Sequence, residues 1–405
     1  MKAIAGLTVL VAIGLGLAVT ARAEPSHLEK VQAVLEKYLA DRAPVEKVTG
    51  VAAYVSFGDP GPAIEAFAGK VGRGPNDAAV TQDTLFQMGS TAKSFTAAVV
   101  LKLEAAGKLS LDDTIGRWLP EYPAWKDVSI RRLLNMTSGI PTYSETQEMS
   151  RLWAEEPQRT LAPEELVALA YPSDTNRLPK PAGWFYSNTG YILAGMIAAK
   201  AAAKPFATLV HELVLEPHGL SSTFYSAGPY PAAVIGRLAH GYFENPACTE
   251  YQPKCTVTWN KPILGRDMRE ASVSWAQAAG GAIANARDVT RWMRAVLEGR
   301  AVPAKQQAEW LSLVSLKTGQ PIRDVSPADP AGFALGLARA IHGTTNGGKG
   351  SAQWFYEGMT LGYRTLYVWY EAEKLLITLQ TNSQPPEGEG KLGAAVEAIH
   401  EVVKR

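Results

Sequence analysis

The chain is short of the residues that metal chemistry requires. Its 405 residues include only two cysteines, Cys248 and Cys255, and six histidines. Two cysteines with no histidine beside them are too few for a zinc site. His211 and Glu212 resemble the start of a zinc-binding helix, but the second histidine of a His-Glu-x-x-His motif is missing. We therefore expect no metal, and we interpret His211 and His218 as ordinary helix and loop residues.

Several other motifs and charge patterns are missing too. The sequence has no phosphate-binding Walker loop, no dinucleotide-binding glycine pattern and no Gly-x-Ser-x-Gly elbow, so we expect no cofactor and no α/β-hydrolase triad. Lysine and arginine number 40 against 39 aspartates and glutamates, without a long basic run. A near-neutral chain of this kind gives no support for nucleic-acid binding. Repeats and low-complexity linkers are absent, and no pattern indicates an oligomeric state.

A single long apolar run is present, at the N-terminus. Lys2 is followed by an apolar stretch over residues 3–21, and Ala21-Arg22-Ala23 precedes Glu24. A positive start, an apolar middle and an Ala-x-Ala exit are typical of a secretory signal peptide. The length of the run also suits an uncleaved membrane anchor, but its glycines and small-residue exit favour cleavage. We predict a signal peptide over residues 1–23 and a periplasmic or secreted mature protein, of net charge −1, that is not stably inserted in a membrane.

The two cysteines agree with export. Only six residues separate Cys248 from Cys255, and these residues have the composition of a loop. In an oxidising compartment such a pair can close a small loop. We therefore favour a disulfide over two free thiols.

Hydrophobic periodicity predicts strands at both ends of the mature chain and helices between them. The predicted elements are a helix over 27–39, strands over 48–57, 63–70, 332–341, 363–370 and 375–381, and a helix over 391–403. This order predicts an α+β fold, with an antiparallel sheet flanked by helices and a mostly helical inserted subdomain. We assign residues 24–405 to one domain. Its sheet part covers about 24–110 and 240–405, and its helical part about 111–239.

Ser90-Thr91-Ala92-Lys93 is the candidate nucleophile motif. It follows a buried extended segment that ends in a glycine and precedes helix formers over 94–106, which places Ser90 at a helix N-terminus with Lys93 one turn later. A serine becomes nucleophilic when a base removes its proton, and a lysine can be that base when burial or nearby positive charge lowers its pKa. On the four residues alone, an ordinary N-capping serine and a surface lysine are the commoner explanation.

A turn-rich segment, 181–191, carries two further candidates. Tyr186 can act as a base or proton shuttle if nearby cations lower its pKa. Asn188 can hydrogen-bond both a substrate amide and an active lysine. Taken alone, Tyr186 is more often a packed aromatic residue with a satisfied hydroxyl.

Four blocks of the sequence, in this order, resemble a known family. Their spans are 86–96, 128–141, 181–191 and 278–292. Together they are similar to the class C β-lactamase-related serine hydrolases, or penicillin-binding superfamily, which include D,D-peptidases, D-aminopeptidases and carboxylesterases. The resemblance extends from about residue 45 to residue 383.

The resemblance implies a covalent mechanism. Ser90 would attack an acyl carbonyl to give an acyl-enzyme, while Lys93 and Tyr186 relay the proton. Asn188 would orient Lys93 and the substrate, and the backbone N–H groups of Ser90 and Met359 would form the oxyanion hole. Which of Lys93 and Tyr186 is the base stays open at this point.

The third motif departs from the family pattern. Relatives carry Lys-Thr-Gly or His-x-Gly on a strand beside the site, whereas the matching triplet here is Tyr356-Glu357-Gly358, followed by Met359. We expect these four residues to contribute to substrate binding, without the cation. Glu357 either points away or faces inward, where it would repel a carboxylate and attract an amine. Arg364 either replaces the cation or is a surface arginine.

These observations predict an exported serine acyl hydrolase that acts on a small-molecule or peptide substrate. Esters, small amides and D-amino-acid peptides fit the missing cation, because their hydrolysis does not require it. β-Lactams and D-Ala-D-Ala peptides carry a carboxylate that favours a paired cation. A class C-type β-lactamase or a D-alanyl-D-alanine carboxypeptidase is therefore the alternative activity. An alternative of a different class is a penicillin- or peptidoglycan-binding module without turnover.

Overall fold

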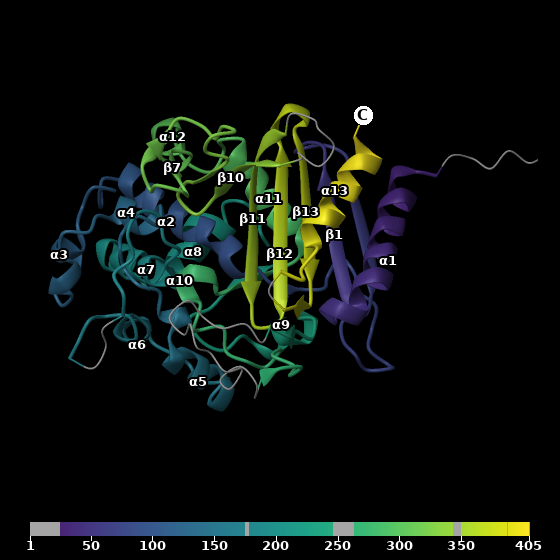
Figure 1. Cartoon of the computed structure of the whole chain (residues 1–405), viewed down its shortest axis with the longest axis horizontal. Coiled ribbons are helices and arrows are strands. Elements are labelled where there is room, and N and C mark those ends of the chain that lie inside the picture. Colours follow the sequence, from purple (N-terminus) through teal and green to yellow (C-terminus); the bar gives the residue numbers. More distant parts are fainter. Residues whose placement is uncertain (1–24, 175–177, 246–262, 343–349, 387, 405) are drawn as a thin grey trace, which may run out of the picture.

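A nine-stranded antiparallel sheet organises the chain (Figure 1). The computed structural model describes residues 25–174, 178–245, 263–342, 350–386 and 388–404. The strand order is β2-β1-β13-β12-β11-β10-β9-β7-β8. The strands are β1 (Gly50–Ser56), β2 (Ala63–Gly69), β7 (Leu313–Ser315), β8 (Pro321–Ile322), β9 (Ala331–Phe333), β10 (Ala338–His342), β11 (Ser351–Thr360), β12 (Tyr363–Tyr370) and β13 (Leu375–Thr381).

Helices from both ends of the chain cover one face of this sheet. The helices α1 (His27–Glu46) and α13 (Leu392–Val403) pack against each other and against the sheet (Figure 1). The helix α1 begins with a capping box between Ser26 and Glu29, in which each residue's side chain accepts a hydrogen bond from the other's backbone N–H. A core of aliphatic side chains fills the space between the two helices and the sheet. On the opposite face α11 (Ala286–Leu297) packs against β1 and β13, and residues 86–92 pack against β12, so β12 and β13 are buried along their whole length.

The remaining helices gather beside the sheet on its β11 side, apart from α9, which lies below the lower ends of β12 and β13 (Figure 1). They are α2 (Lys93–Ala105), α3 (Ile115–Trp118), α4 (Ile130–Leu134), α5 (Gln147–Glu155), α6 (Pro163–Ala168), α7 (Asn188–Ala202), α8 (Phe206–Val210), α9 (Ala232–Arg237), α10 (Gln277–Gly280) and α12 (Ala304–Trp310). The helices α2 and α7 pack together at the centre of this group and are buried on most sides. A large core joins them to the near face of the sheet.

Two small sheets complete the described secondary structure. One contains β3 (Phe86–Gln87), β6 (Ala282–Ala284) and β4 (Thr223–Tyr225), in the order β3-β6-β4. The other pairs β5 (Tyr242–Phe243) with β14 (Ser383–Gln384). The first of these sheets holds the segment that leads into Ser90.

The α+β architecture is confirmed, with its antiparallel sheet and its helices on both sides. The strands predicted over 363–370 and 375–381 coincide with β12 and β13. The single strand predicted over 332–341 is wrong: a tight turn divides it into β9 and β10, and Gly336 adopts a φ of +80° in that turn. Glycine tolerates this conformation, so an apolar run with a glycine inside it folds back on itself.

The proposed signal peptide and the cysteine pair lie outside the described residues. Among the described helices, no single one is long and apolar enough to cross a bilayer. The combined stretch of α7 and residues Phe206–Leu215 reaches that length, but it bends by 84°.

Candidate active site

Ser90 lies where the chain passes from β3 into α2. A 3-10 turn, Gly89–Ala92, joins the two elements, so Ser90 lies at the N-terminal end of α2 with Lys93 one turn later, as predicted. Gly89 begins this turn with a φ of +53°, and this kink delays the start of the helix. The Ser90 side chain is partly exposed, so a substrate can reach its hydroxyl.

Lys93 points inward from the start of α2 and is fully buried. Its Nζ donates hydrogen bonds to Asn188 Oδ1 and to the backbone oxygen of Ala279, both at 2.6 Å. Ser90 Oγ lies 3.1 Å from the same nitrogen. The amine is therefore in the interior, beside the nucleophile, and is not the surface group that the motif alone would suggest.

The surroundings of Lys93 favour an uncharged amine. Burial lowers the pKa of Lys93 well below its ordinary value of 10.5. A neutral amine has two N–H donors and one lone pair, and the two carbonyl oxygens of Asn188 and Ala279 match the two donors. The lone pair is then available to the Ser90 hydroxyl, which can donate to it.

Tyr186 contacts the nucleophile from the segment that precedes α7. Its hydroxyl lies 2.5 Å from Ser90 Oγ. Burial raises the pKa of Tyr186 to about 12, although hydrogen bonds with Ser90 and Tyr356 act in the opposite direction. Tyr186 thus carries its proton at neutral pH. The sequence left open that nearby cations lower the pKa of Tyr186, but the overall shift is upward.

Asn188 begins α7 and hydrogen-bonds both Lys93 and the segment that contains Thr142 and Ser144. Its side-chain oxygen accepts from Lys93, and its Nδ2 donates to Ser144 Oγ at 2.8 Å. Its backbone N–H donates to Thr142 Oγ1 at 3.0 Å. The Asn188 amide orientation is therefore set by a donor at one end and an acceptor at the other.

Sequence analysis did not single out three residues that hold this network. Thr142 and Ser144 support Asn188, and the backbone oxygen of Ala279, in α10, accepts from Lys93. The positions of two of these residues relative to the four blocks that carry the family resemblance could have pointed to them. Thr142 follows the block that ends at residue 141, and Ala279 lies within the block 278–292, which had no assigned role.

The third motif lies on β11, and its side chains alternate between the two faces of the sheet. Tyr356 is buried on the face nearer the helices and hydrogen-bonds Tyr186. Gly358 follows on the same face, where an added Cβ would collide with Met88 O and lie 2.8 Å from the backbone nitrogen of Ser90. A Cβ on Gly89 would lie 2.7 Å from the nitrogen of Met359. The structure therefore brings Tyr356, Gly358 and the backbone of Met359 to Ser90.

Glu357 and Arg364 lie on the opposite face of the sheet. Arg364 is almost completely buried, forms an ion pair with Glu46 and donates to Ser383 O at 3.0 Å. Its Nη1 lies 3.8 Å from a carboxylate oxygen of Glu357. Glu357 thus does not line the site beside Tyr356, unlike our expectation, because adjacent strand residues face opposite sides. Arg364 is neither a surface residue nor a replacement for the missing cation.

The histidines considered in the sequence do not gather into a metal site. Within the described ranges, no group of three or more histidine, cysteine, aspartate or glutamate residues could hold a metal ion. His218 packs against Trp292, with ring centroids 5.1 Å apart, and burial lowers its pKa to about 4.

Comparison with known proteins identifies the family. The family model described as Beta-lactamase matches residues 32–401. The chain belongs to the Beta-lactamase family. Proteins similar to it include one named as an esterase and one named as a D-stereospecific amidohydrolase, which are enzymes of the type that the sequence predicted.

Solved structures match this Beta-lactamase family chain over nearly its whole length. A D-stereospecific amidohydrolase from Streptomyces sp. is 26% identical with a TM-score of 0.70, and the match covers 92% of this chain and 98% of that one. A D-amino acid amidase from Ochrobactrum anthropi SV3 has a TM-score of 0.73 at 22% identity, covering 94% and 100% of the two chains, and shares the fold.

Curated relatives match over shorter segments. Penicillin-binding protein 4* from Bacillus subtilis (strain 168) is 33% identical over 162 residues, which cover 40% of this chain and 35% of that protein. Esterase EstB from Burkholderia gladioli is 32% identical over 174 residues, covering 38% and 42%. The matched region spans less than half the length of each relative.

Proposed function

We propose that this protein is an exported acyl hydrolase that uses Ser90 as its nucleophile and prefers esters and small amides, including D-amino-acid amides. The observation that carries this proposal is the buried network in which Ser90 Oγ contacts both Lys93 Nζ and Tyr186 Oη. The presence of an esterase and a D-stereospecific amidohydrolase among the similar proteins supports the substrate class.

Lys93 is the base in this mechanism, and Tyr186 is the proton donor. The Ser90 hydroxyl attacks the acyl carbonyl while its proton passes to Lys93, whose lowered pKa keeps the amine uncharged. Tyr186, with its raised pKa, retains a proton that it gives to the leaving group, and Lys93 restores that proton. Water then attacks the acyl-enzyme and gives a proton to Lys93, and Lys93 passes that proton to Ser90 Oγ as the carboxylic acid leaves, which restores the Ser90 hydroxyl and the uncharged amine.

Two backbone N–H groups stabilise the tetrahedral intermediate. The nitrogen of Ser90 is positioned by the turn after Gly89, and that of Met359 by the end of β11, and these two segments are in direct contact. Each such donor typically supplies about 3 kcal/mol of transition-state stabilisation.

The absence of a cation in the third motif sets the substrate preference. Tyr356 offers a hydroxyl where relatives place lysine or histidine, and the guanidinium of Arg364 is engaged by Glu46 on the other side of the sheet. A substrate carboxylate would lose a charge-assisted hydrogen bond there. Neutral or amine-bearing acyl donors lose nothing, so they are preferred over β-lactams and D-alanyl-D-alanine peptides.

A parallel assay of four substrates tests the proposal. A short aryl ester, D-phenylalanine amide, a chromogenic cephalosporin and a D-Ala-D-Ala peptide are compared on the mature chain and on Ser90→Ala. We expect turnover of the ester and the amide, at least about a thousandfold loss in Ser90→Ala, and weak turnover of the other two. Faster turnover of the cephalosporin than of the ester would overturn the substrate preference, and Ser90→Ala with normal activity would overturn the mechanism.

The export part of the proposal depends on residues 1–23 and has a separate test. Expression of the full chain followed by cell fractionation and N-terminal sequencing should yield a periplasmic or secreted protein that begins at Glu24. Recovery of a full-length, membrane-bound chain would indicate an uncleaved anchor instead.

A further inference from the structure

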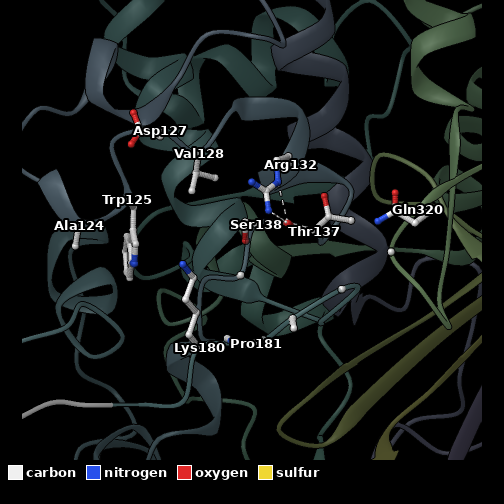
Figure 2. Close-up of a pocket in the computed structure, with 14 residues that line it drawn as sticks. Ala124, Trp125, Asp127, Val128, Arg132, Thr137, Ser138, Lys180, Pro181 and Gln320 are labelled. Atoms are coloured by element: carbon white, nitrogen blue, oxygen red, sulfur yellow. Dashed lines mark hydrogen bonds between the residues drawn. The ribbon is translucent and has the colours of Figure 1, made fainter.

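A cavity of about 540 Å³ lies beside the segment that carries Tyr186 (Figure 2). Three parts of the chain form most of its wall. These are residues 124–128, residues 132–139 and residues 180–183, with Gly319 and Gln320 at one side. We call it the Lys180 pocket.

Glycine residues give the Lys180 pocket its shape. Gly139 has a φ of +69°, and a Cβ there would lie 3.6 Å from Cε of Lys180, so the lysine stem runs across the glycine. Gly319 meets the backbone of Gly183 so closely that an added Cβ would lie 2.6 Å from its carbonyl carbon. The missing side chain at Gly139 leaves room for the Lys180 stem, and the contact between Gly319 and Gly183 closes one side of the cavity.

The groups that face the pocket are mainly hydrogen-bond donors. Lys180 forms no ion pair with any residue that the structure describes, and Figure 2 shows its amine between the Trp125 ring and Ser138, with Arg132 beyond Ser138. Arg132 uses Nε and Nη2 on a single acceptor, Thr137 O, which leaves Nη1 for a ligand. The indole nitrogen of Trp125 lies on the edge of its ring that faces Lys180 (Figure 2).

Lysine, arginine and the indole N–H can donate but cannot accept hydrogen bonds, so a matching ligand must supply acceptors and negative charge. Asp127 is the one carboxylate in the lining, and Figure 2 shows it apart from the Lys180 amine, above Trp125. Two cations against one carboxylate leave the pocket with a net positive charge. Carboxylate and phosphate groups are the usual partners of such an arrangement.

We propose that the Lys180 pocket is a second binding site, separate from Ser90, for a small molecule whose carboxylate or phosphate group is held between Lys180 and Arg132. The pocket has room for a ligand larger than an inorganic ion, since 540 Å³ is within the range of small-molecule sites.

Occupancy of the pocket affects the active site because the two share their walls. Only two residues separate Gly183, which lines the pocket, from Tyr186, so the two positions are at most about 11 Å apart along extended chain. Between them, Phe185 N donates to Met136 O at 2.9 Å, which ties the two walls together. A ligand that bridges Arg132 and Lys180 therefore restrains the backbone that positions the Tyr186 hydroxyl.

Binding is tested on Ser90→Ala, so that the result does not depend on catalysis or on the function proposed above. Inorganic phosphate and succinate are titrated separately by calorimetry, with sodium chloride at matched ionic strength as the reference. The pocket variant is Lys180→Met, and Lys108→Met, at an exposed lysine that lies outside the pocket lining, is the matched control. We expect saturable binding of at least one probe, a loss of about tenfold or more in affinity for Lys180→Met, and no change for Lys108→Met.

The outcome also identifies the ligand chemistry. Binding of phosphate alone points to a phosphorylated ligand, and binding of succinate alone points to a carboxylate. A second readout uses the enzyme with Ser90 intact: a saturating probe should change kcat for the aryl ester, and Lys180→Met should abolish that change. Absence of saturable binding at millimolar probe, or equal affinity in Lys180→Met, would overturn the proposal while leaving the ester hydrolase assignment untouched.

Discussion

At the residue scale, the proton on Lys93 controls how the site can react. The amine is fully buried and its two carbonyl acceptors at 2.6 Å suit the uncharged form. Because burial lowers the pKa of Lys93, the reactive form is lost as pH falls through that lowered pKa and is retained above it. We therefore predict that kcat/KM for a neutral ester rises with pH along a single acidic limb.

Substitution of the amine tests this assignment. Lys93→Met should lower kcat by about a hundredfold or more and remove the acidic limb from the pH profile, since the group that titrates is gone. Lys102→Met, one lysine further along α2, is the control and should keep both kcat and the limb. An unchanged limb in Lys93→Met would show that another group, such as Tyr186, is the base.

Tyr356 is the residue at which substrate charge is selected. Tyr356→His restores the His-x-Gly pattern of relatives and adds a cation next to Tyr186 when the imidazole is protonated. We expect kcat/KM for the chromogenic cephalosporin to increase by about tenfold or more at pH 6, because a charge-assisted hydrogen bond replaces a neutral one. Tyr356→Phe removes the hydroxyl without adding charge and should give no such gain. Equal cephalosporin turnover in all three proteins would contradict our account of the third motif.

At the scale of elements, the oxyanion hole depends on the close approach of β11 to the turn that holds Ser90. Gly358→Ala places a methyl group against Met88 O and next to the nitrogen of Ser90, so one of the two segments must shift. We expect kcat for the ester to fall by about tenfold to a thousandfold while KM changes less. Thermal unfolding measured in parallel separates this effect from loss of the fold.

A glycine in open surroundings provides the matched control. Gly393, in α13, has no atom within 4 Å of an added Cβ, so Gly393→Ala should leave kcat unchanged and stabilise the fold by about 0.5–1 kcal/mol. A folded Gly358→Ala enzyme with the kcat of the parent would contradict the proposed position of the oxyanion hole.

Elements with a clear local signal could be predicted from the sequence, and those that depend on remote contacts could not. The strands at 363–370 and 375–381 are apolar, rich in β-branched and aromatic residues, and have clear ends. The run at 332–341 is also apolar, but it has few β-branched or aromatic residues, and Gly336 turns it into a hairpin. The site followed the same rule. Ser90, Lys93, Tyr186 and Asn188 were found from their motifs, whereas the support from Ser144 and Ala279 O needed the tertiary fold.

At the scale of the whole molecule, one buried ion pair joins the N-terminal helix to the centre of the sheet. Arg364 on β12 pairs with Glu46 at the end of α1, 318 residues earlier in sequence, and also contacts Tyr38 Oη at 3.1 Å. Burial raises the pKa of Glu46, but Arg364 and Arg42 more than offset this effect, and the pKa is lowered overall. A pairing between positions so far apart leaves no trace in local sequence patterns.

Breaking this pair should destabilise the protein without altering the chemistry. Arg364→Ala leaves Glu46 buried beside Tyr38, and we expect a loss of about 3–5 kcal/mol in the free energy of unfolding by urea. Lys37→Ala removes an exposed ion pair with Asp41 on the same helix and should cost no more than about 0.5 kcal/mol. Equal losses for the two variants would contradict the structural role of Arg364.

The same ion pair makes stability depend on pH. Because the pKa of Glu46 is lowered on folding, the stabilisation from Glu46 is present above the ordinary glutamate pKa of about 4.5 and disappears as pH falls below that value.

The central claim is that one hydroxyl, on Ser90, becomes acylated because a buried uncharged amine lies next to it. Labelling with a serine-reactive fluorophosphonate, followed by intact-protein mass spectrometry and peptide mapping, tests this claim most directly. We predict a single adduct on Ser90 in the parent protein, none in Ser90→Ala, and much slower labelling in Lys93→Met. An adduct on another residue, or equally fast labelling of Ser90 without the Lys93 amine, would contradict the account.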